Sequence, residues 1–522
     1  MGDISIKQLD YTDLRIFGNE AGEDEKPAIL NSYFVNKPEF EYFENDQNSF
    51  SIVQGLRGTG KSALLARLAF VRQDNPDKPL VIFIKGSELV AGKPFESKSP
   101  LEYIYEWQQR ICSRINAELG RDIGLALSDR EMALVEYSEI QGFKGRNIVG
   151  ALIDRMNKKL GPISLSASVP QNARSLLQNY MEKETDRKVW LLVDDLDATF
   201  TGSVDETLRL STFFSACRQL SHSVKGLIIR SSVRSDVWTV LNMSDEALDK
   251  CRQYIIDLSW TSNGTSLILT HRIRSFIFHV YNQTFNDTYD SDGYISVRDR
   301  AKYLNTIFPQ KYLFQERQEL PTKVIHILSS GRPRMGLRLC RMAGSYAKQT
   351  KNKGHRPSFI KLSLLYQIIK PFGRDSLRDV VSENKHQCPK LESVVYAFSR
   401  IKARFTTGEL IDFVEDKIRS KGDVYLHGNQ LPATSFQIAH LLFRMGFIVA
   451  VDYVARPRAR KYYKFTDKPN LLRTFTNPDD GLCWIIHPTF AEALDIEIIR
   501  PKITQDVRKT KVWKQKGESS VE

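Results

Sequence analysis

The chain has 522 residues, of which 41% are hydrophobic and 26% charged, an ordinary composition for a globular protein with room for two or three domains. It contains no run approaching the roughly 20 apolar residues of a membrane helix, and its first residues lack the apolar core of a signal peptide. We therefore expect a cytoplasmic protein with no membrane partner. The six cysteines are scattered without a C-x-x-C pair, which suits a reducing compartment and disfavours a structural zinc site.

The net charge of +13 is unevenly distributed along the chain. Residues 1–260 hold 32 Lys and Arg against 37 Asp and Glu, whereas residues 261–522 hold 43 against 25. An acidic half followed by a basic half indicates that any polyanion is bound by the second half. A basic surface that only contacts water explains the same numbers equally well.

Residues 1–45 form a polar lead-in, and its aromatic segment from Tyr33 to Phe43 is expected to be helical and to pack beside the first strand. The apolar run that begins at Phe50 predicts that strand, which is buried. A strong helix pattern opens at Ala63.

Between this strand and this helix, residues 55–62 read GLRGTGKS and fit the phosphate-loop pattern G-x-x-x-x-G-K-[ST] at every position. Glycines let the backbone curl until successive N–H groups point at a phosphate, and the helix amino terminus adds partial positive charge. Lys61 is expected to reach the β- and γ-phosphates, and the Ser62 hydroxyl to complete the Mg²⁺ shell. A chance match in a glycine-containing turn is the alternative, and the flanking strand and helix argue against it. The residues expected to bind the nucleotide here are Gly55, Arg57, Gly58, Thr59, Gly60, Lys61, Ser62 and Ala63.

The second chemical landmark is the apolar run Val189–Val193, which ends in acidic residues. A buried parallel strand that ends in carboxylates delivers them to the edge of a phosphate site. Asp194 is expected to hold Mg²⁺ together with Ser62, and Asp195 to orient or deprotonate the attacking water. Asp197 competes for the second role, with a helix or turn cap as its alternative.

Residues 226–230 predict another strand, which runs into a polar segment containing Arg234. An arginine at the carboxyl edge of a strand can touch the γ-phosphate or its water, whereas a surface arginine is the plainer interpretation. Residues 254–258 predict the last strand of an ATPase core that spans residues 46–261. No N-K-x-D stretch is present to recognise guanine, so ATP is favoured over GTP.

Residues 262–385 are helical and basic, and we interpret them as a lid and linker. Within this region Gly331-Arg332-Pro333-Arg334 marks a loop that feeds a helix. Cations at the start of a helix are unfavourable for the helix dipole, so these two arginines favour an external anionic partner.

Residues 386–500 predict a separate small domain of three helices and a β-hairpin, which is the composition of a winged helix. We expect the helices at residues 391–401, 407–418 and 435–445, and the hairpin strands at residues 447–453 and 461–465 around the basic turn 456–460. The tail 501–522 is basic and is expected to be disordered.

Together these features resemble the AAA+/STAND-like bacterial P-loop ATPases. That group carries G-x-[RK]-G-[ST]-G-K-[ST], an apolar strand ending D-D-[LIV]-D, an R-S-D-[VI]-W motif and a G-x-P-R lid motif. All four occur here in order, at Gly55–Ser62, Asp194–Asp197, Arg234–Trp238 and Gly331–Arg334. The resemblance covers about residues 15–345 and is less specific over the winged helix.

The resemblance implies an α/β fold: a three-layer P-loop core with a helical lid and a C-terminal winged-helix domain. It also implies a homo-oligomer driven between conformations by ATP and Mg²⁺. Ser232 takes the sensor-1 position, Arg334 is the sensor-2 arginine that contacts the nucleotide, and Arg234 is a sensor or a finger acting on a neighbouring subunit. Catalysis is assigned to Asp195, Lys61 and Arg234. Because Asp195 stands where AAA+ ATPases usually carry glutamate, its shorter side chain implies slow, switch-like hydrolysis.

Three functions stay open. The first is an oligomeric ATPase switch or scaffold for a separate effector protein, of the kind found in bacterial antiphage defence loci. The second is a DNA-binding ATPase of the initiator, loader or regulator kind, which meets nucleic acid through residues 456–464 and the basic tail. The third predicted helix offers only Gln437, His440 and Arg444 to a major groove, so non-specific phosphate contact is expected rather than base reading. The third function is a scaffold that keeps ATP as a structural ligand with little turnover.

Overall fold

The computed structural model describes residues 9–75, 79–91, 94–96, 99–123, 129–143, 172–184, 186–244, 246–314, 317–350, 359–427, 430–452, 461–473 and 481–496. The chain divides into two compact units. The phosphate-loop unit comprises Ala21–Ser259. The other unit comprises Met1–Glu20 together with Trp260–Glu522, and we call it the lid unit because it contains the residues predicted to form a lid. The lead-in of residues 1–45 is thus divided between the two units.

The phosphate-loop unit is built on a parallel sheet of five strands in the order β2-β3-β4-β1-β5. Its strands are β1 (Phe50–Gln54), β2 (Leu80–Lys85), β3 (Val189–Asp194), β4 (Leu227–Val233) and β5 (Ile255–Asp257). Every residue of β3 and β4 is buried, as expected of central parallel strands that are covered on both faces. Because β4 lies between β1 and β3, their carboxyl ends meet at one edge of the sheet.

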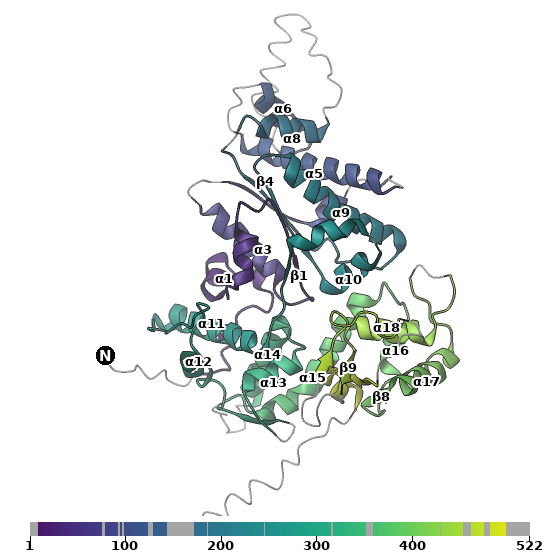
Figure 1. The fold of residues 1–522 in the computed structure, drawn as a ribbon. Helices are drawn as coiled ribbons and strands as arrows, with labels where there is room; N and C mark the ends of the chain where they lie inside the picture. The colour runs from purple at the N-terminus through teal and green to yellow at the C-terminus, as the bar shows by residue number, and fades with distance from the viewer. Residues whose placement is uncertain are drawn as a thin grey trace, which may run out of the picture. The chain divides into compact units, whose positions relative to one another are not determined.

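Helices cover both faces of this sheet. In Figure 1, α1 and α3 lie on one side of the strands, and α5, α9 and α10 lie on the other. The helices of this unit are α1 (Pro27–Tyr33), α2 (Pro38–Glu44), α3 (Lys61–Gln73), α4 (Gly86–Val90), α5 (Pro100–Asp122), α6 (Asp129–Ile140), α8 (Ala173–Met181), α9 (Val204–Ser223) and α10 (Ser235–Ser244), with 3₁₀ turns η2 (Gly22–Asp24) and η3 (Glu246–Tyr254). The helix–sheet–helix arrangement is the three-layer P-loop core that the sequence predicts.

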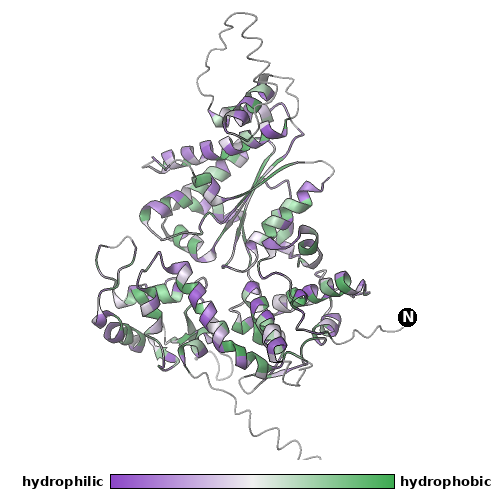
Figure 2. Cartoon of the chain, turned by 180° about the vertical axis from the view of Figure 1, so that it is seen from behind, coloured by the Kyte–Doolittle hydropathy of each residue, from purple (hydrophilic) through white to green (hydrophobic). Residues whose placement is uncertain are grey.

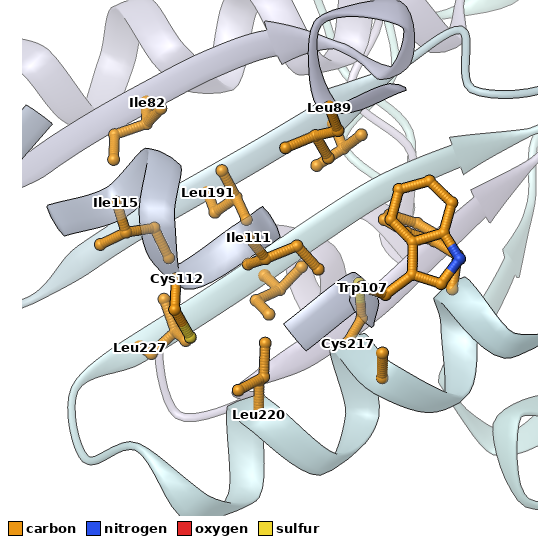
Figure 3. Packing of buried hydrophobic residues seen from close by; sticks show 14 of the residues in the cluster. Ile82, Leu89, Trp107, Ile111, Cys112, Ile115, Leu191, Cys217, Leu220 and Leu227 are labelled. Carbon is orange, nitrogen blue, oxygen red and sulfur yellow. The ribbon is translucent and has the colours of Figure 1, made fainter. Parts of the chain in front are cut away.

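The main core lies between the sheet and the helices α5 and α9 (Figure 3). Trp107, Ile111 and Ile115 recur every fourth residue of α5, so they form one apolar stripe that faces the strands. Leu220 from α9 and Leu191 from β3 complete the contact, and all five side chains are fully buried. Figure 2 shows that hydrophobic and hydrophilic residues alternate along the helices, as expected of amphipathic helices with one buried face.

Strand β4 continues three residues beyond the predicted end at residue 230. Arg230 therefore lies inside a buried central strand. Its guanidinium is fully buried, lies 5.0 Å from the ring centroid of Trp190 and donates to the backbone carbonyls of Phe43, Asn45 and Asn48. An arginine whose donors are satisfied in this way can occupy a central strand. The burial lowers the pKa of Arg230 to about 9.

The first part of the lid unit is mostly helical. It contains α11 (Ser262–Tyr281), α12 (Val297–Leu304), α13 (Pro321–Leu328), α14 (Pro333–Thr350) and α15 (Leu362–Asn384), with a short hairpin of β6 (Tyr312–Phe314) and β7 (Arg317–Glu319) that the sequence did not predict. The amino-terminal turn η1 (Leu14–Ile16) packs on α11 and α14, where Tyr11, Ile16 and Phe17 join the helical core.

The carboxyl-terminal part of the lid unit, residues 386–496, combines helices with a four-stranded antiparallel sheet of order β10-β9-β11-β8. Its elements are α16 (Leu391–Tyr396), β8 (Arg404–Thr406), α17 (Thr407–Lys417), η5 (Arg419–Lys421), α18 (Ser435–Arg444), β9 (Ile448–Asp452), β10 (Lys461–Tyr463), β11 (Cys483–Ile486), α19 (Pro488–Ala491) and η6 (Glu492–Leu494). We call this part the C-terminal domain; its classification as a winged helix stays a prediction.

Within the C-terminal domain, β9 and β10 pair antiparallel where the sequence predicts a hairpin. The predicted first helix is shorter than expected, since α16 ends at Tyr396. Strands β8 and β11 were not predicted. The basic turn 456–460 and the tail 501–522 lie outside the described residues. Across the described ranges, no helix is long and apolar enough to cross a membrane.

Candidate active site

The phosphate loop joins β1 to α3 in the phosphate-loop unit. Gly58 and Gly60 adopt φ angles of +79° and +106°, which side chains on L-residues disfavour. Between them, the Thr59 hydroxyl donates to the Leu56 carbonyl at 2.8 Å and closes the turn. A Cβ atom on Gly55 would lie 2.6 Å from the Thr59 hydroxyl oxygen and 2.8 Å from the Leu258 carbonyl oxygen, so this position has room only for glycine. The pattern glycines are therefore required by the curl of the loop.

Lys61 begins α3, and its ammonium lies inside the loop. Its Nζ donates to the carbonyls of Gly55 and Leu56 at 2.9 and 3.3 Å, and the residue is 8% exposed. Burial lowers the pKa of Lys61, whereas the negative charges of Asp197 and Asp194 oppose that shift. The lysine thus faces the acidic end of β3.

Asp194 is the last residue of β3 and is buried. The Ser232 hydroxyl, from the neighbouring strand β4, donates to its carboxylate. The backbone N–H of Asp195 donates to the same hydroxyl oxygen at 3.4 Å. Ser232 therefore orients the carboxylate of one acid and the backbone of the next.

Asp195 turns the chain away from the sheet with φ +55°, a left-handed conformation that Asp tolerates better than most residues. Asp195 is exposed, whereas Asp194 is buried. Partial desolvation of the carboxyl and the neighbouring Asp194 raise the pKa of Asp195, while Lys61 and Lys85 oppose the shift. The site therefore presents one carboxyl group to solvent, close enough to Lys61 for the two charges to interact.

Asp197 and Arg234 are both buried. Asp197 accepts a hydrogen bond of 2.7 Å from the backbone N–H of Arg234, just before α10. The Arg234 guanidinium binds Asp236 through two hydrogen bonds, from Nε to Oδ1 at 3.2 Å and from Nη2 to Oδ2 at 2.5 Å. Burial raises the pKa of Asp197, and the charges of Arg234 and Lys61 oppose the rise.

These residues form a donor set that fits a magnesium-bound nucleoside triphosphate. The glycine curl and Lys61 suit phosphate oxygens, and the half-buried Ser62 and the carboxylate of Asp194 are oxygen ligands of the kind that Mg²⁺ takes. Among the described residues, no group of three or more His, Cys, Asp or Glu side chains is arranged to hold a metal ion alone. Mg²⁺ needs no such group, since one or two protein ligands and the substrate phosphates hold it.

The structure gathers most of the sequence-predicted site residues in the phosphate-loop unit. Arg57 is exposed at the tip of the loop, and Ala63 packs under Gly22 and Leu30 of the lead-in. Arg334 lies in the first turn of α14 in the lid unit, so its predicted contact with the nucleotide stays a prediction.

Three charged residues of the site were missed from the sequence. Lys85 ends β2 in register with Asp194, Asp236 pairs with Arg234, and Glu23 in η2 acts electrostatically on Asp195. Only Asp236 carried a signal, because it stands two residues after Arg234 in the R-S-D-[VI]-W motif. Lys85 and Glu23 reach the site through pairing and packing that no local pattern reports.

No protein-family model matches the chain, and no curated protein matches it. Among solved structures, the chain is similar to the ORC2 protein of Aeropyrum pernix (ADPNP–ADP complexes), with a TM-score of 0.36 and 10% identity over 86% of this chain and 94% of that chain. It is also similar to PCH-2 of C. elegans, with a TM-score of 0.22 and 10% identity over 67% of each chain. Structural similarities with such low TM-scores carry no further argument. The P-loop core is shown by the order of the parallel strands.

Proposed function

We propose that this protein binds ATP with Mg²⁺ and hydrolyses it slowly. The observation that carries the proposal is the Ser232 hydrogen bond to Asp194. It connects the acidic end of β3 to the strand that lies directly beside the phosphate loop. A phosphate loop alone binds many anions, whereas a loop with an oriented carboxylate across one strand suits a metal–triphosphate.

Each residue has a role in this reaction. The N–H groups of the loop and Lys61 bind the phosphates, and Ser62 and Asp194 hold Mg²⁺, which supplies charge neutralisation at the phosphate oxygens. Asp195 orients or deprotonates the attacking water, because its carboxyl group is exposed to solvent and interacts electrostatically with Lys61. Asp197 is buried and occupied by the Arg234 N–H, which makes it a structural residue. The short side chain of Asp195 is the reason we propose slow turnover.

At the level of the whole chain, we propose an AAA+/STAND-like oligomeric switch that signals to a separate effector protein, in bacterial antiphage defence. The four motifs in their order support this class.

The alternative DNA-binding function is weakened by α18. Gln437 accepts the backbone N–H of Thr434 at 2.9 Å, and His440 contacts the Pro469 carbonyl at 3.3 Å. Arg444 donates to the side chain of Gln387. The polar side chains that α18 would need for contact with base edges therefore make hydrogen bonds within the C-terminal domain. The DNA-binding alternative then depends on contact between the basic turn and phosphates.

The test is ATP binding and phosphate release by the purified chain, compared with Lys61→Ala and with the control Lys188→Ala, which replaces a half-buried lysine outside the phosphate loop that pairs with Asp46. We expect Lys61→Ala to abolish ATP binding and Lys188→Ala to match the unaltered protein. If Lys61→Ala binds ATP as tightly as the unaltered protein, the phosphate loop is not the ATP-binding site. Binding without measurable turnover would favour the structural-ligand alternative.

The solution mass with and without ATP, Mg²⁺ and duplex DNA separates the remaining functions. A defined assembly that forms with ATP and ignores DNA supports the switch. A monomer or dimer that changes only with DNA supports the DNA-binding alternative.

A further inference from the structure

Helix α15 joins the two parts of the lid unit (Figure 1). Its first half contributes Leu365 and Ile369 to the core of the helical part, and its second half contributes Leu377 to the core of the C-terminal domain. Between them, Gly373 lets α19 pack directly on α15, since a Cβ atom there would lie 2.4 Å from the Thr489 carbonyl oxygen. One face of α15 is thus held along its length, which fixes the direction of the opposite face.

The opposite face carries positive charge and no negative charge. The exposed residues of α15 recur every three or four positions, as expected of one face of a helix. They are Ser363, Gln367, Pro371, Arg374, Arg378 and Ser382, and we call them the outer face of α15. None of the six is an acid or a large apolar residue. Lys361 and Lys385 lie just beyond the two ends of the helix and are also exposed.

Asp495 brings a further arginine beside this face. Its carboxylate accepts a hydrogen bond from Lys370 of α15 and lies 3.8 Å from Nε of Arg400. The hydrogen bond and charge of Lys370 lower the pKa of this carboxylate, and the charges of Arg400 and Arg374 lower it further. Three cations from two segments of the lid unit therefore lie around one carboxylate.

The ion pairs of this group leave its cations open to another anion. Arg378 pairs with Asp375 at 3.5 Å, but its side chain is 78% exposed, and that of Arg400 is 82% exposed. Ion pairs as exposed as these contribute little, so both guanidinium groups remain available to a second partner. In this group, four cations share two carboxylates: Lys370, Arg374, Arg378 and Arg400 against Asp375 and Asp495.

The chemistry of the outer face indicates the kind of anion. It offers guanidinium, amide and hydroxyl groups, which are the side chains that contact phosphate oxygens of nucleic acids. It lacks the large apolar residues with which a surface helix enters a membrane or fills a protein interface. Arg374 and Arg378 are about 6 Å apart along the helix axis. This spacing is close to two base-pair steps of about 3.4 Å each, so the two arginines suit phosphates of one strand.

We propose that the outer face of α15, together with Lys370 and Arg400, binds the phosphate backbone of duplex DNA. Contacts of this kind position a protein on DNA and read no sequence. The inference goes beyond the proposed function, since it requires no nucleotide at the phosphate loop. It also differs from the contact expected of the basic turn 456–460, because it uses other residues of the lid unit.

The first test is binding of a labelled DNA duplex of random sequence, without ATP and at several salt concentrations. We expect Arg374→Gln/Arg378→Gln to weaken binding about 10- to 60-fold at 0.1 M salt, where each phosphate contact contributes a factor of about eight relative to 1 M salt. The slope of log K against log salt should become shallower by about 1.8. Arg374→Lys/Arg378→Lys should keep the slope, because lysine contacts phosphate as a point charge.

The matched control is Arg298→Gln/Lys323→Gln. It also removes two exposed cations of the lid unit, one from α12 and one from α13, and Lys323 is paired with Glu319 much as Arg378 is paired with Asp375. This control should bind DNA like the unaltered protein. Equal weakening in the two double variants would mean that only net charge matters, and would overturn the inference.

The second test has the opposite sign. Asp495→Asn removes the carboxylate that pairs with Lys370 and Arg400, so we expect it to strengthen DNA binding by up to about eightfold at 0.1 M salt. Asp495 is left-handed with φ +56°, and asparagine also tolerates this conformation, so the backbone is kept. Asp423→Asn removes another exposed carboxylate of the C-terminal domain and should have no effect. Unchanged or weaker binding by Asp495→Asn would contradict the proposed surface.

Other polyanions are tested with the same proteins. Duplex RNA of the same sequence and vesicles that contain phosphatidylserine replace the DNA. Binding to vesicles or to RNA that is lost in Arg374→Gln/Arg378→Gln, without comparable binding to DNA, would assign the surface to a membrane or to RNA and overturn the proposal. Failure of the unaltered protein to bind duplex DNA at 0.1 M salt would overturn it as well.

The inference and the proposed function fail independently. Lys61→Ala should bind DNA like the unaltered protein, and Arg374→Gln/Arg378→Gln should bind ATP like it. If Lys61→Ala keeps its affinity for ATP, the proposed function fails and the DNA-binding surface stands. If Arg374→Gln/Arg378→Gln keeps its affinity for DNA, the inference alone is wrong.

Discussion

The Ser232 hydroxyl donates a hydrogen bond to the Asp194 carboxylate, although 38 residues separate the two in the sequence. The strand order explains this proximity, since β4 lies directly beside β3. On its other side, Ser232 pairs in register with Val53 of β1, the strand that leads into the phosphate loop. One serine thus lies between the two chemical motifs.

We expect Ser232→Ala to lower ATP turnover about tenfold. The loss of a hydrogen bond to a charged group corresponds to about 1.5 kcal/mol, which is about a factor of ten in rate. ATP affinity is expected to change less, because the phosphate loop is untouched. The measurement is steady-state phosphate release, with the dissociation constant of ATP determined separately.

Ser231→Ala is the matched control for this experiment. Ser231 is the neighbouring residue of the same strand, is fully buried, and its hydroxyl has no hydrogen-bond partner among the described residues. It should keep its turnover. Equal losses in both variants would mean that β4 is sensitive to any change and that Ser232 has no special role.

Replacement of Asp195 by alanine is expected to lower turnover, whereas replacement of Asp197 by alanine is expected to lower stability. Asp195→Ala should keep ATP binding and stability but lose turnover by about 100-fold or more, the usual contribution of a positioned acid or base. Asp197→Ala removes the carboxylate that accepts the hydrogen bond of the buried Arg234 N–H, so it should lower the free energy of unfolding by about 1–3 kcal/mol. Turnover assays and denaturant unfolding of both variants distinguish them. Wild-type turnover in Asp195→Ala would assign the catalytic role elsewhere.

Arg234 is expected to act within its own subunit. Its guanidinium is buried and held by both carboxylate oxygens of Asp236, so reaching a neighbouring subunit would first require breaking this pair. We predict that mixing Arg234→Ala protein with Asp195→Ala protein restores no ATPase activity. Restored activity in the mixture would show that Arg234 completes the site of a neighbour.

Local patterns made the central part of this site predictable from sequence. The phosphate loop is eight consecutive residues, and Asp194 directly follows an apolar run, so both motifs are complete in a short window. The boundary between the two units could not be predicted from a local pattern, because the division of the lead-in after residue 20 depends on packing. Tyr11 belongs to the core of the lid unit, whereas Leu30 packs near Ala63 of the phosphate-loop unit.

The contacts that the sequence could not predict are long-range and polar. No periodicity reports that His487 meets Ser330, since the two residues are 157 positions apart. The sequence predicts a strand that ends at Arg230, and arginines are usually exposed. The structure buries it because three backbone carbonyls of residues 43–48 happen to meet its donors.

Gly55→Ala is expected to weaken ATP binding about 5- to 150-fold. Its Cβ would approach the Leu258 backbone carbonyl at 2.8 Å, and backbone cannot move aside cheaply, so the loop must shift at a cost of about 1–3 kcal/mol. Gly408→Ala, in the helix α17, is the control, since nothing lies within 4 Å of its added Cβ. Unaltered ATP affinity in Gly55→Ala would show that the loop tolerates a wider curl than the structure has.

Acid is expected to destabilise the lid unit before the phosphate-loop unit. Burial lowers the pKa of His271, His326 and His440 to about 4 and that of His487 to about 3, from an ordinary value of 6.5. All four belong to the lid unit, and His222 is the single histidine of residues 21–259. The difference between the units therefore comes from histidines that are buried in the neutral form.

The sign follows from proton binding. Between pH 6.5 and about 4 the unfolded chain protonates these histidines and the folded unit does not, so stability is present above pH 6.5 and is lost as the pH falls. Each histidine adds a slope of up to about 1.4 kcal/mol per pH unit. Hydrogen exchange at pH 7 and pH 5, corrected for the intrinsic rate, should show loss of protection in α11, α13 and α18 but not in β3 and β4. His487→Gln should reduce the pH slope by one proton, and a slope identical to that of the unaltered protein would contradict the assignment of a neutral, buried ring.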